Sequence, residues 1–131
     1  MNLTDLIGKE FELAARGPDK YDCWGVCIEV SKRMGKELPD FFYNKESQDE
    51  LLSSIIDDNK DEVLTKIDKP EAGDIVLLKV VPKMTTHTGI MLDSVRFIHI
   101  TSKTRSCIER IDSPLWSRRV KGFYRRCQKK N

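Results

Sequence analysis

The sequence predicts an α+β fold in which N-terminal helices pack on a roughly five-stranded, mainly antiparallel sheet. Apolar residues recur at three- and four-residue spacing in the first half, which is typical of amphipathic helices. From residue 69 onward, β-branched runs alternate with turn residues, which is typical of strands. The length of 131 residues suits one hydrophobic core, so we expect residues 1–131 to form a single domain.

Two helices are expected before residue 40. The first covers residues 1–10, where Thr4 is the expected N-cap. The second covers residues 23–34, with Asp22 as its N-cap and Gly35 at the position of a C-terminal cap. Apolar residues of this second helix recur every three or four positions, so one of its faces is expected to be buried.

An acidic, amphipathic stretch follows at residues 46–67, and it is predicted to form two helices that break near residues 57–59. Beyond it, turn residues such as Asp93 and Ser94 separate runs with the pattern of strands. The predicted strands cover residues 74–81, 86–92, 96–101, 106–111 and 120–126.

The charge balance argues against a dedicated nucleic-acid-binding domain. The 23 Lys and Arg residues nearly cancel the 21 Asp and Glu residues and leave a net charge of +2. A basic segment at residues 118–130 is interpreted as a solvated strand edge, and attraction to an anionic polymer is the alternative. The apolar run at residues 75–81 is too short to span a membrane. The first residues lack the pattern of a secretion signal, so we expect cytoplasmic synthesis without a signal peptide.

One of the four cysteines has the position of a nucleophile. A reducing cytosol favours thiols over disulfides, so the cysteines are expected to be free. Cys23 begins a helix, where the helix dipole and free backbone N–H groups would lower the pKa of a thiol. Cys27, Cys107 and Cys127 are interpreted as small packing residues.

A cysteine nucleophile needs a base, and the sequence has only two histidines, His87 and His99. They fall in neighbouring predicted strands joined by a short turn, so they are expected to lie side by side. A neutral imidazole can take the proton of the Cys23 thiol, or stabilise the thiolate as an ion pair, while the second histidine accepts the other ring N–H and fixes the tautomer.

A zinc site is the alternative use of Cys23, Cys27, His87 and His99. Structural zinc sites usually contain close ligand pairs on turns, and the spacing of these residues does not fit that pattern. The sequence also lacks a phosphate-binding loop and a dinucleotide fingerprint. We therefore expect neither a metal ion nor a cofactor.

Three blocks of sequence carry a family resemblance. Residues 6–11 and 16–25, the latter ending in Asp-Cys-Trp-Gly, precede a Pro-Glu-Ala-Gly-Asp segment at residues 70–74 and the histidine pair at residues 87–99. Together with residues 116–125, these blocks resemble the NlpC family of papain-like cysteine peptidases, which cut bacterial cell-wall peptides. The Asp-Cys-Trp-Gly version is similar to that of phage tail-associated members.

The resemblance implies a papain-like fold, with Cys23 as the nucleophile, His87 as the base and His99 as the residue that orients His87. It also implies hydrolysis of peptidoglycan stem peptides or muropeptides between D-γ-glutamate and the diamino acid, through a thioester. The expected partners are that substrate and, for the phage type, tail proteins.

Four residues near the nucleophile are expected to contact the substrate: Phe11, Tyr21, Asp22 and Trp24. Phe11 stands where the family often has tyrosine, and Trp24 replaces a serine that in some members helps to hold the free amine of the substrate. Asp22 is retained for that contact. Tyr21 and Trp24 have a second interpretation, as core aromatics beside the helix.

Two other functions fit the same sequence. A non-catalytic structural or assembly component of a phage tail or similar device would explain the missing signal and the Asp-Cys-Trp-Gly variant. An acyltransferase on the same fold would pass the thioester to an amine instead of water. Virion association or delivery to the cell wall is the corresponding expectation for location.

Overall fold

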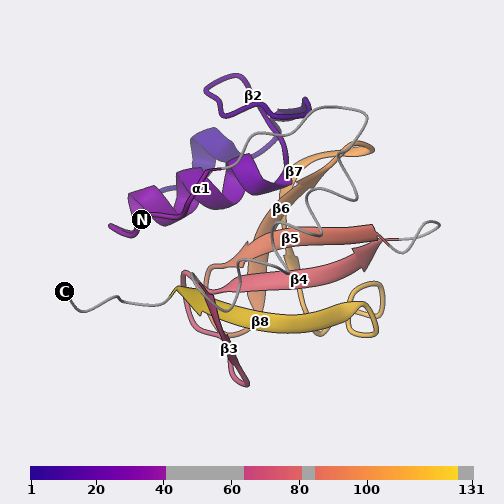
Figure 1. The fold of residues 1–131 in the computed structure, drawn as a ribbon. Helices are drawn as coiled ribbons and strands as arrows, with labels where there is room; N and C mark the ends of the chain where they lie inside the picture. The colour runs from indigo at the N-terminus through magenta and orange to yellow at the C-terminus, as the bar shows by residue number, and fades with distance from the viewer. Residues whose placement is uncertain (41–63, 81–84, 127–131) are drawn as a thin grey trace.

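The computed structural model describes residues 1–40, 64–80 and 85–126 (Figure 1). Within these ranges an α-helix lies on a six-stranded sheet, and a two-residue parallel ladder precedes the helix. The elements are the 3-10 helix η1 (Thr4–Leu6), β1 (Glu10–Phe11), β2 (Lys20–Tyr21), α1 (Cys23–Arg33), β3 (Leu64–Ile67), β4 (Ile75–Val80), β5 (Thr85–Met91), β6 (Arg96–Thr101), β7 (Thr104–Arg110) and β8 (Val120–Arg126).

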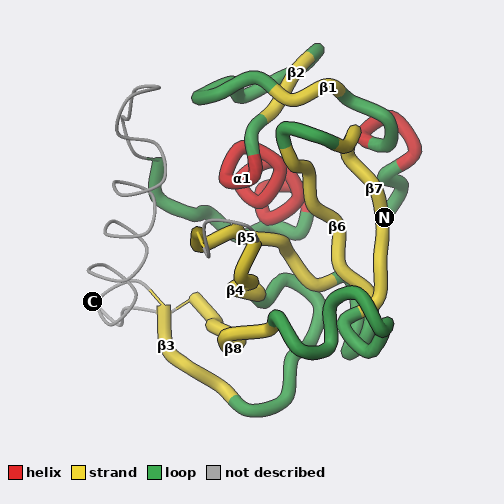
Figure 2. The backbone as a smooth tube through the Cα atoms, turned by 90° about the vertical axis from the view of Figure 1, so that its right-hand side faces the viewer, coloured by secondary structure: helices red, strands yellow, loops and turns green. Residues whose placement is uncertain are grey.

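The large sheet has the strand order β3-β8-β4-β5-β6-β7, and all neighbouring strands are antiparallel. Helix α1 contacts β5 and β6, as Figures 1 and 2 show from two directions. This arrangement confirms the predicted fold class and all five predicted strands. The sixth strand, β3, was not expected.

Strand β3 corrects the prediction that residues 46–67 form two helices broken near residues 57–59. Leu64 is buried and pairs with Arg126, and Ile67 pairs with Phe123, so this segment extends the sheet beside β8. The apolar spacing of so short a segment does not distinguish a helix end from a strand, and the pairing with β8 decides between them. The predicted helices over residues 46–63 lie outside the described residues.

Strand β8 corrects a second prediction, that the basic C-terminal segment forms a strand edge. It lies between β3 and β4, so both of its sides are paired. Arg125 on this strand donates two hydrogen bonds, of 2.9 and 2.8 Å, to the buried carboxylate of Asp74. At least one basic side chain of the segment therefore forms an ion pair that joins β8 to the loop before β4.

Helix α1 begins as the sequence predicts. The carboxylate of Asp22 accepts a 2.8 Å hydrogen bond from the backbone N–H of Gly25, and Gly35 follows the helix with a φ of +79°. A side chain at position 25 would place its Cβ 2.4 Å from the carbonyl oxygen of Ala15, which is closer than atoms can approach. Glycine at this position therefore lets the chain before the helix pack against its first turn.

The N-terminal helix is shorter than predicted and has no side-chain cap. Only Thr4–Leu6 are helical, with 3-10 geometry, and Leu3 occupies the N-cap position without a side-chain hydrogen bond. Thr4 is not the cap, because it is the first residue inside the helix, and its backbone N–H donates to the side chain of Asn2. The buried side chain of Leu6 anchors this turn to the core.

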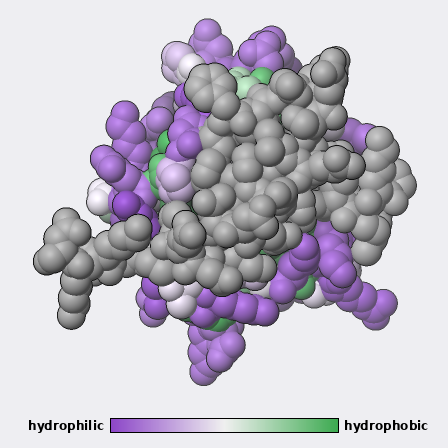
Figure 3. Space-filling view, viewed as in Figure 1, coloured by the Kyte–Doolittle hydropathy of each residue, from purple (hydrophilic) through white to green (hydrophobic). Residues whose placement is uncertain are grey.

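Alternating residues of the sheet face two hydrophobic clusters. On β4, Ile75 and Leu77 join the cluster that includes the buried side chains of α1, while Val76 and Leu78 join a second cluster with Trp116. The described surface in the view of Figure 3 is mostly hydrophilic, with small hydrophobic areas. Among the described residues, no helix combines the length and hydropathy needed to cross a membrane.

Candidate active site

Cys23 lies at the N-terminus of α1 and is almost completely buried, with 5% of its surface exposed. Its thiol lies beside the backbone and hydroxyl of Thr88, the residue that follows His87 on β5. Burial, reinforced by the charge of Asp22, raises the pKa of Cys23 to about 11, although contacts with Thr88 and the backbone of Trp24 act in the opposite direction. The sequence-based expectation of a lowered pKa is therefore wrong, because desolvation outweighs the helix terminus.

The raised pKa predicts how Cys23 reacts with iodoacetamide. Because the thiolate is the reacting form, the alkylation rate should keep rising with pH until about 11 in the folded protein. In urea, the alkylation rate of Cys23 should level off at a pH near 9.0, which is the ordinary pKa of the thiol. Peptide mapping by mass spectrometry measures each cysteine separately. A rate for folded Cys23 that is already constant at neutral pH would contradict the raised pKa.

The two histidines meet across β5 and β6, as the sequence predicts. His87 Nε2 lies 2.8 Å from His99 Nδ1, and both rings are buried. Burial and the neighbouring His99 lower the pKa of His87 to about 3, and burial also lowers the pKa of His99. Both imidazoles are therefore neutral at neutral pH, and each ring carries one proton.

Glu109 on β7 determines which nitrogens carry those protons. Its carboxylate is hydrogen-bonded to His99 Nε2, and although burial acts in the opposite direction, contacts with Trp116 and His99 lower its pKa. An ionised carboxylate only accepts hydrogen bonds, so His99 Nε2 is the donor and His99 Nδ1 accepts from His87 Nε2. The lone pair of neutral His87 is then on Nδ1. Glu109, His99 and His87 thus form a chain of hydrogen bonds that leaves one specified nitrogen basic.

Trp116 lies in the loop before β8, and its ring covers this chain of hydrogen bonds. Its ring stacks on His87, with centroids 6.3 Å apart, and meets His99 edge-on at 5.1 Å. The indole Nε1 is buried, and its N–H acts on the carboxylate of Glu109, although no hydrogen bond of good geometry joins the two among the described residues. The ring therefore shields the imidazoles from water, which is consistent with their lowered pKa values.

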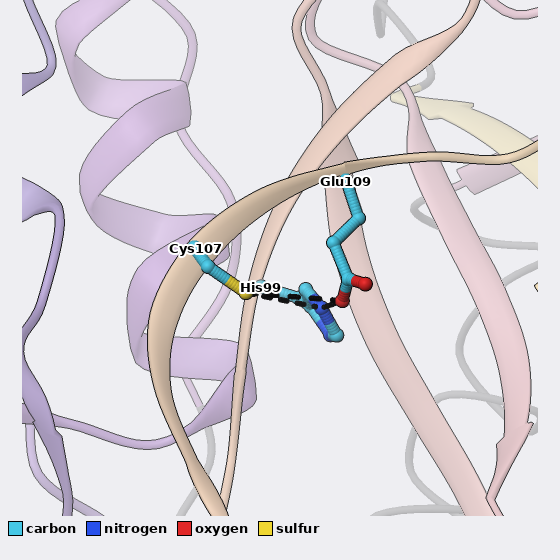
Figure 4. A group of neighbouring side chains, drawn as sticks. All are labelled: His99, Cys107 and Glu109. Atoms are coloured by element: carbon cyan, nitrogen blue, oxygen red, sulfur yellow. Dashed lines mark hydrogen bonds and ion pairs between the residues drawn. The ribbon is translucent and has the colours of Figure 1, made fainter. Parts of the chain in front are cut away.

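Cys107 corrects the interpretation of three cysteines as packing residues. Cys27 fits that interpretation, with none of its surface exposed, whereas Cys107 is only partly buried. The Cys107 sulfur lies 3.8 Å from both His99 Nε2 and Glu109 Oε2 (Figure 4). Cys23, Cys27 and Cys107 are all free thiols, and Cys127 lies outside the described residues.

The predicted substrate contacts have structural roles in this conformation. Tyr21 and Trp24 are buried in the core, and Trp24 Nε1 donates a 2.9 Å hydrogen bond to the carbonyl of Pro39. Phe11 is half-buried on β1 and packs against the same core. Asp22 accepts hydrogen bonds from Ala14 N–H, Arg16 Nη1 and Gly25 N–H. The substrate contacts of these four residues remain predictions.

The structure brings the histidines together, but it does not join them to the nucleophile by a hydrogen bond. Among the described hydrogen bonds, none connects the Cys23 thiol with an imidazole. The thiol is next to Thr88, whereas the ring of His87, one position earlier on β5, stacks on Trp116. Neighbouring side chains of a strand point to opposite faces, so the contact with Thr88 does not place the thiol beside His87. The pairing of Cys23 with His87 remains a prediction.

Sequence reasoning missed Glu109, Cys107 and Trp116. The alternation of β7 does place positions 107 and 109 on one face, and this was a usable signal. The pairing of His99 with Cys107, and of Phe97 with Glu109, depends on the register of the β6–β7 hairpin. The sequence pattern does not specify that register, so the approach of Glu109 to His99 required the folded structure.

Comparison with known proteins identifies the family. The model of the NlpC/P60 family matches residues 8–125. No curated protein matches the chain. The family match covers the proposed nucleophile, both histidines and Glu109.

Solved structures agree with the fold. An NLP/P60 family protein from Staphylococcus aureus, described as similar to a lipoprotein, has a TM-score of 0.64 and 20% identity over 95% of this chain. NlpC2 from Trichomonas vaginalis has a TM-score of 0.60 and 19% identity over 92% of the chain. The NlpC/p60 domain of the peptidoglycan hydrolase SagA has a TM-score of 0.54 and 19% identity over 91%.

The lengths of these proteins differ from that of the chain. The matched region covers 38% of the S. aureus protein, 43% of NlpC2 and 87% of the SagA domain. The likeness at these identities establishes a shared papain-like fold. Together with the family match over residues 8–125, it shows that the chain belongs to the NlpC/P60 family, which includes cell-wall peptidases.

Proposed function

We propose that this chain is a cysteine peptidase that hydrolyses the bond between D-γ-glutamate and the diamino acid in peptidoglycan stem peptides. The observation that carries the proposal is the Glu109–His99–His87 chain of hydrogen bonds, which leaves Nδ1 of His87 as the basic nitrogen. Family membership supports the class of substrate, and the SagA domain is described as part of a peptidoglycan hydrolase.

In the proposed reaction, His87 Nδ1 takes the proton of the Cys23 thiol as the sulfur attacks the amide carbonyl. The raised pKa of Cys23 and the lowered pKa of His87 make the resting pair neutral, so proton transfer and attack are coupled. The backbone N–H of Cys23, at the start of α1, is a donor for the oxyanion. The resulting imidazolium protonates the leaving amine, and water then hydrolyses the thioester.

Glu109 acts in this mechanism as a positioning residue for the base. Replacing it by glutamine removes the charge that holds the proton on His99 Nε2, so kcat is expected to fall by roughly 10²-fold with little change in KM. Glu109→Asp should recover part of the rate, because it restores the carboxylate. Steady-state kinetics with a synthetic stem peptide measures both constants. The exposed Glu10→Gln is the control, and equal rates for Glu109→Gln and Glu10→Gln would contradict this role.

Digestion of purified peptidoglycan tests the function itself. Mass spectrometry of the soluble fragments should detect peptides with a new free amine on the diamino acid, and iodoacetamide treatment of the protein at high pH should abolish them. Fragments cut at another bond, or fragments that persist after complete alkylation of Cys23, would overturn the proposal. Transfer to an added amine without hydrolysis would instead identify an acyltransferase.

A catalytically inert assembly component, as in a phage tail, is the second candidate. The burial of the Cys23 thiol favours it, together with pKa values of about 11 for Cys23 and about 3 for His87, which prevent a resting ion pair. This candidate predicts no fragment release even at high protein concentration. The peptidoglycan digestion therefore decides between the two.

A further inference from the structure

Three side chains other than that of Cys23 bring a nitrogen, a sulfur and an oxygen atom close together. His99 Nε2, Cys107 Sγ and a carboxylate oxygen of Glu109 all lie within 4.8 Å of one another. Figure 4 shows Cys107 and Glu109 reaching His99 from the same strand, β7. Tetrahedral zinc, with bonds of about 2.0–2.3 Å, requires its ligand atoms to be about 3.3–3.6 Å apart. The sulfur already lies 3.8 Å from each of the other two atoms, so only the hydrogen-bonded His99–Glu109 pair must separate.

We propose that His99, Cys107 and Glu109 bind a zinc ion, with water as the fourth ligand, and that this ion inhibits the enzyme. Three protein ligands of mixed N, S and O type with an open fourth position are a usual zinc environment. The Cys107 proton is released to solvent on binding, because a coordinating thiol is deprotonated by the metal. The inhibition rests on the proposed peptidase function, whereas the binding does not.

Inhibition follows from the protons of the two imidazoles. A zinc ion on His99 Nε2 requires that nitrogen to be unprotonated, so the ring proton moves to Nδ1. His99 Nδ1 then donates to His87 Nε2, which reverses the hydrogen bond between the rings. His87 is consequently protonated on Nδ1, the nitrogen that must accept the thiol proton. The number of protons on the two rings is unchanged, but the base is lost.

The site is accessible to an ion without opening the core. Cys107 and Glu109 are partly exposed, whereas His99 behind them is buried, with 1% of its surface exposed. Strand β7 is at the end of the sheet order, and on the side away from β6 its Ser106 exchanges backbone hydrogen bonds with Gly8 and Lys9. The partly exposed side chains of Cys107 and Glu109 are therefore the route to the site. A hydrated ion can therefore reach the sulfur and carboxylate first and then displace the contact between His99 and Glu109.

Binding is tested on the full chain without substrate. Cobalt(II) serves as a spectroscopic probe for zinc, because a thiolate ligand gives an intense charge-transfer band in the near ultraviolet. The band is expected in the wild type and in Cys23→Ala, and its loss is expected in Cys107→Ala and in Cys107→Ser, which retains the side-chain size. Calorimetry with zinc should give an affinity about tenfold or more lower for both Cys107 variants. An unchanged band or affinity in these variants would overturn the site.

Inhibition is tested as the ratio of rates with and without zinc, so that each variant is its own reference. Wild-type hydrolysis should be inhibited at zinc concentrations that fill the calorimetric site, and Cys107→Ser should need about tenfold more zinc. Equal inhibition of both proteins would mean that zinc acts at Cys23, and it would overturn the inference while leaving the peptidase intact. Metal binding by a protein that releases no fragments would overturn the peptidase and leave the site intact.

Discussion

Replacing Cys23 by alanine is expected to reduce the rate of stem-peptide hydrolysis by roughly 10³-fold or more, because no other group of the proposed site supplies the thioester-forming atom. The variant should still fold, since alanine fits the position and the side chain of Cys23 makes no ion pair. Rates are measured with the synthetic stem peptide under single-turnover conditions, and circular dichroism checks the fold.

Cys27→Ala is the matched control for this experiment. Cys27 lies one turn further along α1, is completely buried and is also a free thiol, so its replacement removes the same atom from the same helix. Its hydrolysis rate should stay within a few-fold of the wild type. Comparable hydrolysis rates for Cys23→Ala and the wild type would exclude Cys23 as the nucleophile.

Replacing Asp22 by asparagine is expected to cost about 2–4 kcal/mol of the free energy of unfolding, a large part of the stability of a small domain. Asp22 Oδ1 accepts from Gly25 N–H and from Arg16 Nη1, each at 2.8 Å, and Oδ2 accepts from Ala14 N–H at 2.8 Å. An asparagine amide has only one acceptor oxygen. Whichever way it is oriented, its NH2 group takes the place of one carboxylate oxygen and faces a hydrogen-bond donor instead of accepting from it. The substitution also leaves the half-buried Arg16 without this buried carboxylate.

Urea denaturation followed by circular dichroism measures the loss. Asp112→Asn is the control, because Asp112 forms an ion pair with Arg110 at an exposed position, and its replacement should leave the midpoint unchanged within error. Similar midpoints for Asp22→Asn and Asp112→Asn would show that the Asp22 network does not stabilise the start of α1.

The elements of the fold that were predicted correctly follow mostly from local sequence patterns. The start of α1 follows from a short polar side chain at Asp22 before an apolar periodic segment, and β4 to β8 follow from β-branched runs between turns. The errors fall where the local signal is weak. Residues 64–67 adopt a strand because β8 offers them a pairing partner, and no property of those four residues alone selects that outcome.

The order of Cys23, His87 and His99 in the sequence indicated the family resemblance. The contact between the histidines was also predictable, because a short turn between two strands brings their residues together. The ionisation of Cys23 did not follow in the same way. Its position at a helix N-terminus is local and visible in the sequence, whereas its burial beneath β5 depends on packing. Burial has the larger effect, so the pKa of Cys23 is raised.

The sequence by itself therefore determined the secondary structure of the core, the family and the candidate nucleophile and histidines, because each depends on short-range pattern or order along the chain. Only the tertiary structure decided that Glu109 polarises the histidine pair, that Cys107 stands beside it and that β8 lies inside the sheet. These features depend on strand register and on which side chains are removed from water. Both are set by contacts between residues far apart in sequence, and the local pattern does not encode them.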